Sequence, residues 1–272
     1  MKNNKDLAIL VLSCDKYSDL WDDFFNLKEQ HWPDCPYPTY VATDSVQYER
    51  PGVQVIHFGN IRTWTVCARK AIEKIDSHYI ALFLEDAFIY KKIDSSIIEV
   101  DVQIMKEKGI DFLTLERDRT NKHTPNETPI APHIWKIDKH QEYGIDTSAA
   151  IWEKSFLLHE LAKADLDAWM FEVSKNKEAA TERGLEGNIY FDDRLPFNIS
   201  PIEIVREGKI TPNSIRFFKK LGYTINTSRR PVMSEFKLLW YKLKCFVVTH
   251  RSIYGLARIL AKTFGIKTYN NA

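Results

Sequence analysis

Short apolar runs alternate with helical stripes along the first third of the chain. Four apolar runs predict strands: Leu7–Leu12, Thr39–Ala42, Val53–Phe58 and Tyr79–Leu84. Continuous runs of this length are typical of strands that are covered on both faces. Between them, apolar residues recur at helical spacing from Leu20 to Leu27, after Ser18 as a predicted N-cap, and from Trp64 to Ile75. The predicted order is strand, helix, strand, strand, helix, strand.

The pattern continues past this point with one long interruption. We predict a helix from Ser95 or Ser96 to Lys108 that stops at Gly109, and a strand at Phe112–Leu115. The polar stretch 117–142 has three prolines and predicts a long loop, in which His123, His133 and His140 are surface residues. A strand at Thr147–Trp152, a helix at Glu153–Ala162 and a helix from Thr211–Pro212 to Gly222 complete the prediction.

Acidic residues follow three of the predicted strands. Asp15 and Asp44 come after the first two strands, and Glu85-Asp86 follows the fourth at once. The alternation of elements predicts an α/β fold with a Rossmann-type sheet flanked by helices, in which ligands bind at the carboxyl ends of the strands. Carboxylates there suit a divalent cation that is shared with substrate phosphates. Each acid alone is better explained as a helix cap or a surface ion pair, but three in this order favour function.

Composition adds an asymmetry of charge. The 272 residues are 44% hydrophobic and 28% charged, which excludes a disordered chain, a collagen and a coiled coil. The net charge of +1 hides a basic tail, since residues 213–272 hold twelve Lys and Arg against one acid, Glu235. The other residues carry an excess of acids. The chain therefore predicts an acidic body of one or two domains with a basic extension.

The basic extension contains two apolar stripes at helical spacing. One runs from Phe236 to Phe246 and the other from Ile253 to Phe264, with Lys and Arg interleaved. Two basic amphipathic helices follow from this pattern. Three interpretations stay open: contact of residues 229–267 with an anionic membrane surface, packing on the body or on a second subunit, and binding of nucleic acid. The bulky apolar stripes favour lipid or protein, and we expect no nucleic-acid partner.

The cysteines and the N-terminus bear on the compartment. Cys14, Cys35, Cys67 and Cys245 are far apart, so no CxxC metal or redox motif is present. The first apolar run has no small-residue cleavage site after it, and no stretch reaches the roughly 20 uncharged residues of a membrane span. We therefore expect a cytoplasmic protein, with contact at the inner face of the cell membrane through the basic extension.

Three segments carry a resemblance to a known family. AILVLSCDKYSDLW, YVATD and IRTWTVCARKAIEKIDSHYIALFLEDAFI resemble the nucleotide-binding half of GT-A glycosyltransferases, in particular bacterial enzymes of capsule and lipopolysaccharide glycan synthesis. TSAAIWEKSFLLHELAKADLDAWMFE is similar to their acceptor half. The resemblance implies a catalytic domain at 1–212, divided into a nucleotide-sugar half at 1–116 and an acceptor half at 117–212, followed by the basic helical tail at 213–272.

The resemblance also implies roles on the donor side. Asp15 and Asp44 match positions that contact the nucleoside of the donor, and Arg62 matches a basic residue near the base or phosphates. Glu85 and Asp86 stand in place of the DxD motif, which binds a divalent ion and the donor diphosphate, with Asp86 as the metal ligand. No second acid stands two residues after either one, so both a Mn²⁺- or Mg²⁺-dependent site and a metal-free site remain open.

On the acceptor side, Glu172 is the candidate general base of an inverting transfer, and Asp165 and Asp167 are alternative bases. Trp169 is a candidate wall for a sugar ring. The competing interpretation is that Trp169 belongs to the core and Glu172 is a solvated helix residue. The predicted activity is transfer of a sugar from a nucleotide-sugar donor to a polysaccharide or lipid-linked glycan acceptor.

Two other functions compete with this prediction. One is a catalytically silent glycan-binding or scaffold protein on the same fold. The other is a sugar nucleotidyltransferase, which would require a Gly-rich phosphate loop after the first strand. The segment SCDKYSDLW at that place contains no glycine, which disfavours the nucleotidyltransferase.

Overall fold

A computed structural model describes residues 6–61, 63–115 and 128–241 of the chain. The chain forms two compact units, residues 1–201 and residues 202–272, and each is described by itself. The first unit contains the large sheet and every predicted site residue. Arg62 and the second predicted basic helix lie outside the described residues.

Within the described residues, eight strands form one mixed sheet in the order β3-β2-β1-β4-β7-β5-β8-β6. The strands are β1 (Leu7–Leu12), β2 (Thr39–Thr43), β3 (Val53–His57), β4 (Tyr79–Leu84), β5 (Phe112–Thr114), β6 (Ile134–Lys136), β7 (Ala150–Glu153) and β8 (Ile189–Asp192). Strands β1 to β4 are parallel to one another. Strand β7 runs antiparallel to both β4 and β5, so β5 and its parallel neighbour β8 run in the direction of β4. Strand β6 is antiparallel to β8. The predicted α/β fold with a Rossmann-type sheet flanked by helices is confirmed.

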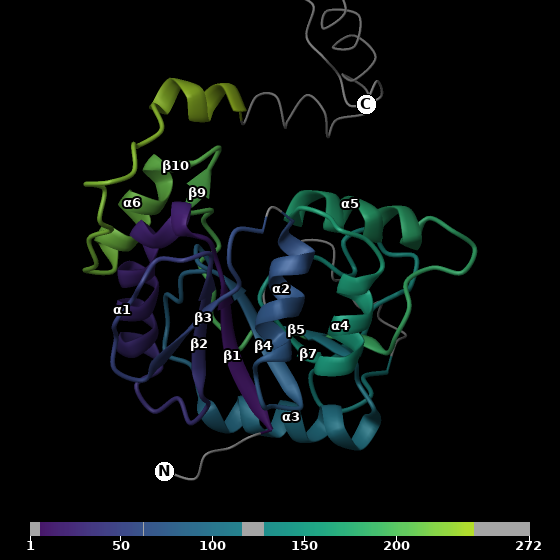
Figure 1. Cartoon of the computed structure of the whole chain (residues 1–272). Helices are drawn as coiled ribbons and strands as arrows, with labels where there is room; N and C mark the ends of the chain where they lie inside the picture. The colour runs from purple at the N-terminus through teal and green to yellow at the C-terminus, as the bar shows by residue number, and fades with distance from the viewer. Residues whose placement is uncertain (1–5, 62, 116–127, 242–272) are drawn as a thin grey trace, which may run out of the picture. The chain divides into compact units, whose positions relative to one another are not determined.

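Helices cover both faces of this sheet. The helices α2 (Trp64–Glu73), α4 (Lys154–Ala162) and α5 (Ala168–Ala179) lie together on one face (Figure 1). There they enclose a core to which Leu10, Leu82 and Ala150 contribute. On the opposite face, Phe24 of α1 (Trp21–His31) packs edge-on against Phe83. Successive side chains of a strand point to opposite faces, and both faces are covered by helices. Both sets of side chains are therefore apolar, and each strand is a continuous apolar run in the sequence.

Local sequence sets several helix ends as predicted. The helix α3 (Ser95–Lys108) begins after Asp94, whose carboxylate accepts from the backbone N–H of Ser96. It ends at Gly109, which has φ of 62° and so adopts a left-handed conformation that favours glycine. Glu153 is the N-cap of α4, one residue before the helix.

The predicted N-cap at Ser18 is wrong. Residues Asp15–Leu20 form a 3₁₀ helix, η1, and α1 starts only at Trp21. The helical spacing of Leu20, Trp21 and Phe24 is present, but a 3₁₀ turn precedes the α-helix and takes Ser18 into its interior. Short 3₁₀ turns are frequent before α-helices, and the apolar pattern does not separate the two.

Two strands of the large sheet are missing from the prediction. The predicted loop 117–142 contains β6, and the region after Glu172, where the pattern is weak, contains the rest of α5 and then β8. Three residues are too few for β6 to establish a period. Strand β8 is fully buried and is followed by a second acid, Asp193, so it repeats the pattern that marked β4.

The second unit begins with a short hairpin of β9 (Val205–Arg206) and β10 (Lys209–Ile210). Helix α6 (Pro212–Lys220) follows, with Thr211 as its N-cap and Pro212 at its start, as predicted. Residues 235–241 form a further helix as far as they are described. Over the described ranges, none of the helices is long and apolar enough to cross a membrane.

Candidate functional site

The carboxyl ends of three parallel strands lie level with one another. Leu12 of β1 pairs with Ala42 of β2 and with Leu84 of β4. The residues that follow these strands therefore meet at one edge of the sheet. Asp15, Asp44 and Glu85-Asp86 all lie within three residues of a strand end, so the structure brings the predicted donor-side acids to one edge.

Asp15 is held by the loop that follows β2. Its carboxylate accepts from the Thr43 hydroxyl at 2.8 Å, from the backbone N–H groups of Ser45 and Val46 at 2.9 Å, and from the Ser45 hydroxyl. Burial opposes ionisation, but these hydrogen bonds outweigh it and hold the pKa of Asp15 well below its usual range. The ionised side chain thus fixes the 43–46 loop, while its predicted contact with a nucleoside stays a prediction.

Asp44 is tied to the end of β1 in return. Its Oδ2 accepts from the backbone N–H of Asp15 at 2.8 Å. Only one of its carboxylate oxygens is used in this bond, so the other can accept from a ligand. The Asp15 and Asp44 pair thus joins the loops after two adjacent strands through hydrogen bonds in both directions.

The pKa of the Cys14 thiol reflects the acidic residues around this edge. Burial raises its pKa, and the carboxylates of Glu85 and Asp44 raise it further. Burial, followed by Asp44 and Cys14, raises the pKa of Cys67 to about 11. Glu85 and Asp44 therefore lie within electrostatic range of one thiol. Cys14, Cys35 and Cys67 are free thiols, and Cys245 lies outside the described residues.

Glu85 and Asp86 occupy the turn directly after β4. Glu85 is buried, at 8% exposure, whereas Asp86 is half-buried. Across the described part of the chain, these two acids do not join a third His, Cys, Asp or Glu in a compact ligand group. A cation at Asp86 would therefore complete its shell with phosphate oxygens and water, which is the usual way in which Mg²⁺ is held.

Glu172 lies at the same edge as the strand-end acids. Its Oε1 accepts from the backbone N–H of Thr147 at 3.1 Å and from the Thr147 hydroxyl. Strand β7 runs antiparallel to β4, and its Ala150 pairs with Leu82. The residues that precede Ala150 therefore lie beside those that follow Leu82, so Thr147 lies at the end of β4 where Glu85 stands. Both bonds go to one carboxylate oxygen, so Oε2 is the oxygen that can receive a proton.

Helix α5 determines the environment of Glu172. Phe171 is buried and packs against Trp64 at the start of α2, with ring centroids 5.4 Å apart. Trp169 and Met170 are instead exposed. The interpretation of Trp169 as core is therefore wrong, because one turn of α5 divides its aromatic residues between core and surface.

The two alternative bases take part in local structure. Asp167 is the N-cap of α5, and its carboxylate accepts from the backbone N–H of Met170 at 2.7 Å. Asp165 forms an exposed ion pair with Arg69 at 2.9 Å. Asp165 and Asp167 thus form surface contacts within the protein. Glu172 is instead held by Thr147 near the carboxyl end of β4.

A further acidic strand end was missed by sequence reasoning. Strand β8 ends at Asp192, and Asp193 follows it. Asp192 and Asp101 of α3 are both fully buried, and Arg194 pairs with each of them at 2.6 Å. Burial, and then the neighbouring Asp192 carboxylate, raise the pKa of Asp101 to about 8. The run IYF followed by two acids could have revealed this end, since it repeats the pattern of β4.

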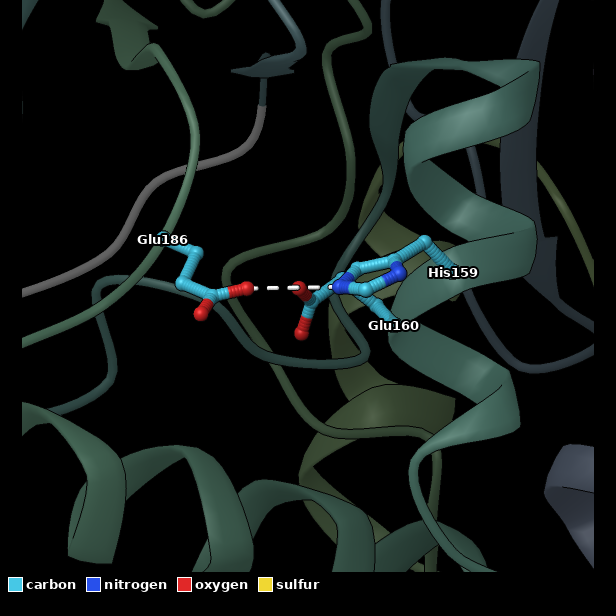
Figure 2. A group of neighbouring side chains, drawn as sticks. All are labelled: His159, Glu160 and Glu186. Atoms are coloured by element: carbon cyan, nitrogen blue, oxygen red, sulfur yellow. Dashed lines mark hydrogen bonds and ion pairs between the residues drawn. The ribbon is translucent and has the colours of Figure 1, made fainter.

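A group of His159, Glu160 and Glu186 could in principle hold a metal ion, because its ligand atoms lie within 4.8 Å of one another (Figure 2). Lysines already supply positive charge to this group. The Lys163 ammonium lies 2.7 Å from Glu160 and 3.1 Å from Glu186, and the buried Lys175 pairs with Glu160 as well. We interpret the group as an ion-pair network that joins α4 to α5 and to the segment before β8.

Comparison with known proteins identifies similar folds only. No protein-family model and no curated protein sequence matches the chain. Among solved structures, S. aureus TarS is 10% identical with a TM-score of 0.42, over 69% of this chain and 36% of that one. A cytidylyltransferase from Leptospira borgpetersenii is 13% identical with a TM-score of 0.39, over 65% and 71% of the two chains.

A third similar structure is the bifunctional IspDF from Campylobacter jejuni, at 12% identity and a TM-score of 0.37, over 66% of this chain and 52% of that one. The chain thus spans about a third of TarS and half of IspDF. With scores below 0.5, the assignment of the fold rests on the sheet topology and not on these neighbours.

Proposed function

We propose that the chain transfers a sugar from a nucleoside-diphosphate donor to a glycan acceptor, with Glu172 as general base. The observation that carries the proposal is the position of Glu172: Thr147 holds it at the sheet edge to which β1, β2 and β4 bring their acids. A base and a donor site at one edge are what an inverting transfer requires. The acceptor is a growing polysaccharide or a lipid-linked glycan.

Each bond and proton of the proposed transfer can be assigned to Glu172, the acceptor and the donor. The acceptor hydroxyl gives its proton to Oε2 of Glu172 as its oxygen attacks the anomeric carbon. The bond between that carbon and the diphosphate oxygen breaks, and the nucleoside diphosphate leaves with the electron pair. The bonds from Thr147 to Oε1 hold the carboxylate in one orientation, so that Oε2 is positioned before the acceptor binds.

The donor side is assigned to the loops that Asp15 and Asp44 join. We infer that Asp44 accepts from the nucleoside and that Asp15 keeps the loop in place through its four bonds. Asp86 would hold a divalent cation together with the donor phosphates. When bound, the cation stabilises the negative charge of the leaving diphosphate.

Nucleotide binding is the first prediction of this proposal. We expect one of UDP, GDP, dTDP or CMP to raise the melting temperature of the full chain, because a ligand present at 100 times its Kd stabilises the fold by about 2.7 kcal/mol. Asp44→Asn should weaken that binding, and Asp86→Asn should remove any dependence on Mn²⁺. The matched control is Asp138→Asn, whose exposed side chain only caps a turn at His140.

The outcome of that titration separates the alternatives. Binding of one nucleotide that is insensitive to Mn²⁺ would retain the donor site and reject the cation at Asp86. Absence of binding by all four nucleotides would reject the donor site and leave the silent scaffold as the better hypothesis. A nucleotidyltransferase is disfavoured by the loop after β1, where η1 begins at Asp15 without a glycine.

We also propose that the basic extension contacts an anionic membrane surface through residues 229–267. In the described helix 235–241, Phe236 is 79% exposed and Leu239 is 66% exposed, while Leu238 is buried. The twelve basic residues of 213–272 complement anionic lipid, and each contributes on the order of 1 kcal/mol near such a surface. Apolar side chains on a basic helix are typical of interfacial binding.

Vesicle sedimentation tests this contact. We expect the full chain to bind vesicles of phosphatidylcholine with 25% phosphatidylglycerol and to leave pure phosphatidylcholine in solution. The double variant Phe236→Ser, Leu239→Ser should reduce binding about tenfold or more, because the apolar area that enters the interface is lost. Val100→Ser on α3 is the control, since Val100 is also exposed but lies in the first unit. Equal binding by both variants would contradict the proposal.

A further inference from the structure

One carboxylate holds two aromatic rings at the far end of the sheet. Asp193, directly after β8, accepts from the Trp135 indole N–H at 2.8 Å and contacts Nδ1 of His133 at 2.8 Å. The histidine is exposed, with 52% of its side chain accessible. Trp135 lies in β6 and His133 directly precedes that strand, while Asp193 directly follows β8. The antiparallel pairing of β6 with β8 brings the three side chains together. We call this group the Asp193 clamp.

The hydrogen bond to Asp193 selects one tautomer of the neutral His133 ring. An ionised carboxylate can only accept hydrogen bonds, so Nδ1 of His133 carries the proton that faces Asp193. In the neutral ring, the other nitrogen, Nε2, then carries a lone pair and can accept a hydrogen bond from outside. Asp193 thus presents His133 as an oriented acceptor on the surface of the molecule.

The backbone of His133 is also in an uncommon conformation. Its φ of 70° lies in the left-handed region that favours glycine and asparagine. The backbone N–H of Asp193 donates to the His133 carbonyl at 3.1 Å, so the same residue holds both the backbone and the ring. Uncommon backbone of this kind persists where the surrounding structure enforces it, and it is frequent in binding sites.

The clamp lies at the same sheet edge as Glu172. One residue on each of five neighbouring strands is paired with the next across the sheet, in the order Leu82, Ala150, Thr114, Phe191 and Trp135. Leu82, Ala150 and Phe191 share one core with α5, and Trp135 packs against that core. Strand β8 runs in the direction of β4, so its exit meets the edge to which Glu172 is fixed. From β7 to β6 there are three strand spacings, or about 14 Å.

From this placement we propose that the Asp193 clamp is a remote subsite for the acceptor glycan. The inference rests on the proposed function, in which Glu172 deprotonates the acceptor. The spacing of about 14 Å between β7 and β6 leaves room for an acceptor of more than one sugar along this edge of the sheet. His133 Nε2 accepts from a sugar hydroxyl, and Asp193 is a positioning residue that acts through His133 and Trp135. Longer acceptors would thus bind more tightly than short ones.

Binding of defined glycans by the full chain tests the subsite. The probe is an array of bacterial polysaccharide fragments from disaccharides to hexasaccharides, read with and without the nucleotide that binds best. We expect the wild type to retain some glycans of three or more sugars. His133→Asn keeps a residue that tolerates the left-handed backbone but removes the imidazole, and should weaken their binding at least tenfold. Lys136→Ala, an exposed change at the other end of β6, should leave binding unchanged.

The outcomes keep this inference apart from the proposed function. Equal glycan binding by His133→Asn and the wild type would reject the subsite, whatever the nucleotide does. Nucleotide binding by a wild type that retains no glycan on the array would reject the subsite while the donor site stands. A wild type that retains glycans but is stabilised by none of the four nucleotides would reject the proposed transfer and leave the clamp as a glycan-binding site only. His133→Asn should leave the nucleotide-induced shift in melting temperature as it is in the wild type.

Discussion

Replacing Glu172 by Gln is expected to lower the rate of sugar transfer by about 10² to 10⁴-fold. Glutamine keeps an amide oxygen that can accept from the backbone and hydroxyl of Thr147, so the geometry of α5 is retained. The amide cannot take the proton of the acceptor hydroxyl, so the loss falls on the chemical step. The measurement is single-turnover transfer from the nucleotide sugar that the binding experiment selects.

Two variants on the same segment serve as controls. Asp165→Asn removes an exposed ion pair with Arg69, and Asp167→Asn retains a good N-cap for α5. Both should transfer sugar at rates close to the wild type. A full loss in Asp165→Asn or Asp167→Asn, together with an active Glu172→Gln, would reassign the base. Nucleotide-induced stabilisation of Glu172→Gln should equal that of the wild type, which separates loss of chemistry from loss of the donor site.

Replacing Arg194 by Met is expected to cost about 3 kcal/mol of folding free energy. Arg194 bridges Asp192 and Asp101, both fully buried, and methionine would leave two carboxyl groups in the interior without their cation. Urea unfolding of the full chain measures the effect. Arg183→Met is the matched control: Arg183 is 81% exposed and pairs only with Glu186, so its loss should cost less than about 1 kcal/mol.

The same group predicts a dependence of stability on pH. Since burial and Asp192 raise the pKa of Asp101 to about 8, the folded chain keeps the Asp101 proton between about pH 4 and pH 8, where the unfolded chain has lost it. The folded state then binds more protons, so this group's contribution is fully present below pH 4 and declines as the pH rises towards 8. Asp101→Asn should remove that decline, because asparagine is neutral at every pH.

The double variant Arg194→Met, Asp101→Asn completes the experiment. At neutral pH it should be destabilised about as much as Arg194→Met, because Asp101 is already neutral and the buried Asp192 carboxylate lacks its cation in both variants. A slope of stability against pH that is the same in Asp101→Asn and in the wild type would contradict the buried proton. Equal destabilisation by Arg194→Met and Arg183→Met would contradict the role of Arg194 as the bridging cation.

Sequence alone determined the parallel part of the sheet, strands β1 to β4, and the acids that follow β1, β2 and β4. The runs Leu7–Leu12 and Tyr79–Leu84 became β1 and β4 with the predicted bounds, because a strand buried on both faces needs an unbroken apolar run. The acids after them were visible for the same reason, as a sharp change from apolar to charged. Glycine and N-cap chemistry likewise determined both ends of α3 to within one residue.

Tertiary structure decided what each acid does. Asp15 resembled a ligand-binding residue, yet its carboxylate is occupied by a loop thirty residues away. The bond between Thr147 and Glu172 joins residues 25 apart, and only the reversal of β7 takes Thr147 to the edge at Glu85. No local pattern encodes the direction of a strand, because side-chain alternation is the same for parallel and antiparallel pairing.

The far end of the sheet was decided by tertiary structure as well. Strand β6 has three residues, and its hydrogen bonds exist only because β8 lies beside it. His133 therefore reads as one more polar residue of a proline-containing loop, until the pairing of β6 with β8 sets it against Asp193. A short strand draws its stability from its neighbour and not from its own residues, and for that reason the clamp is a property of the folded sheet.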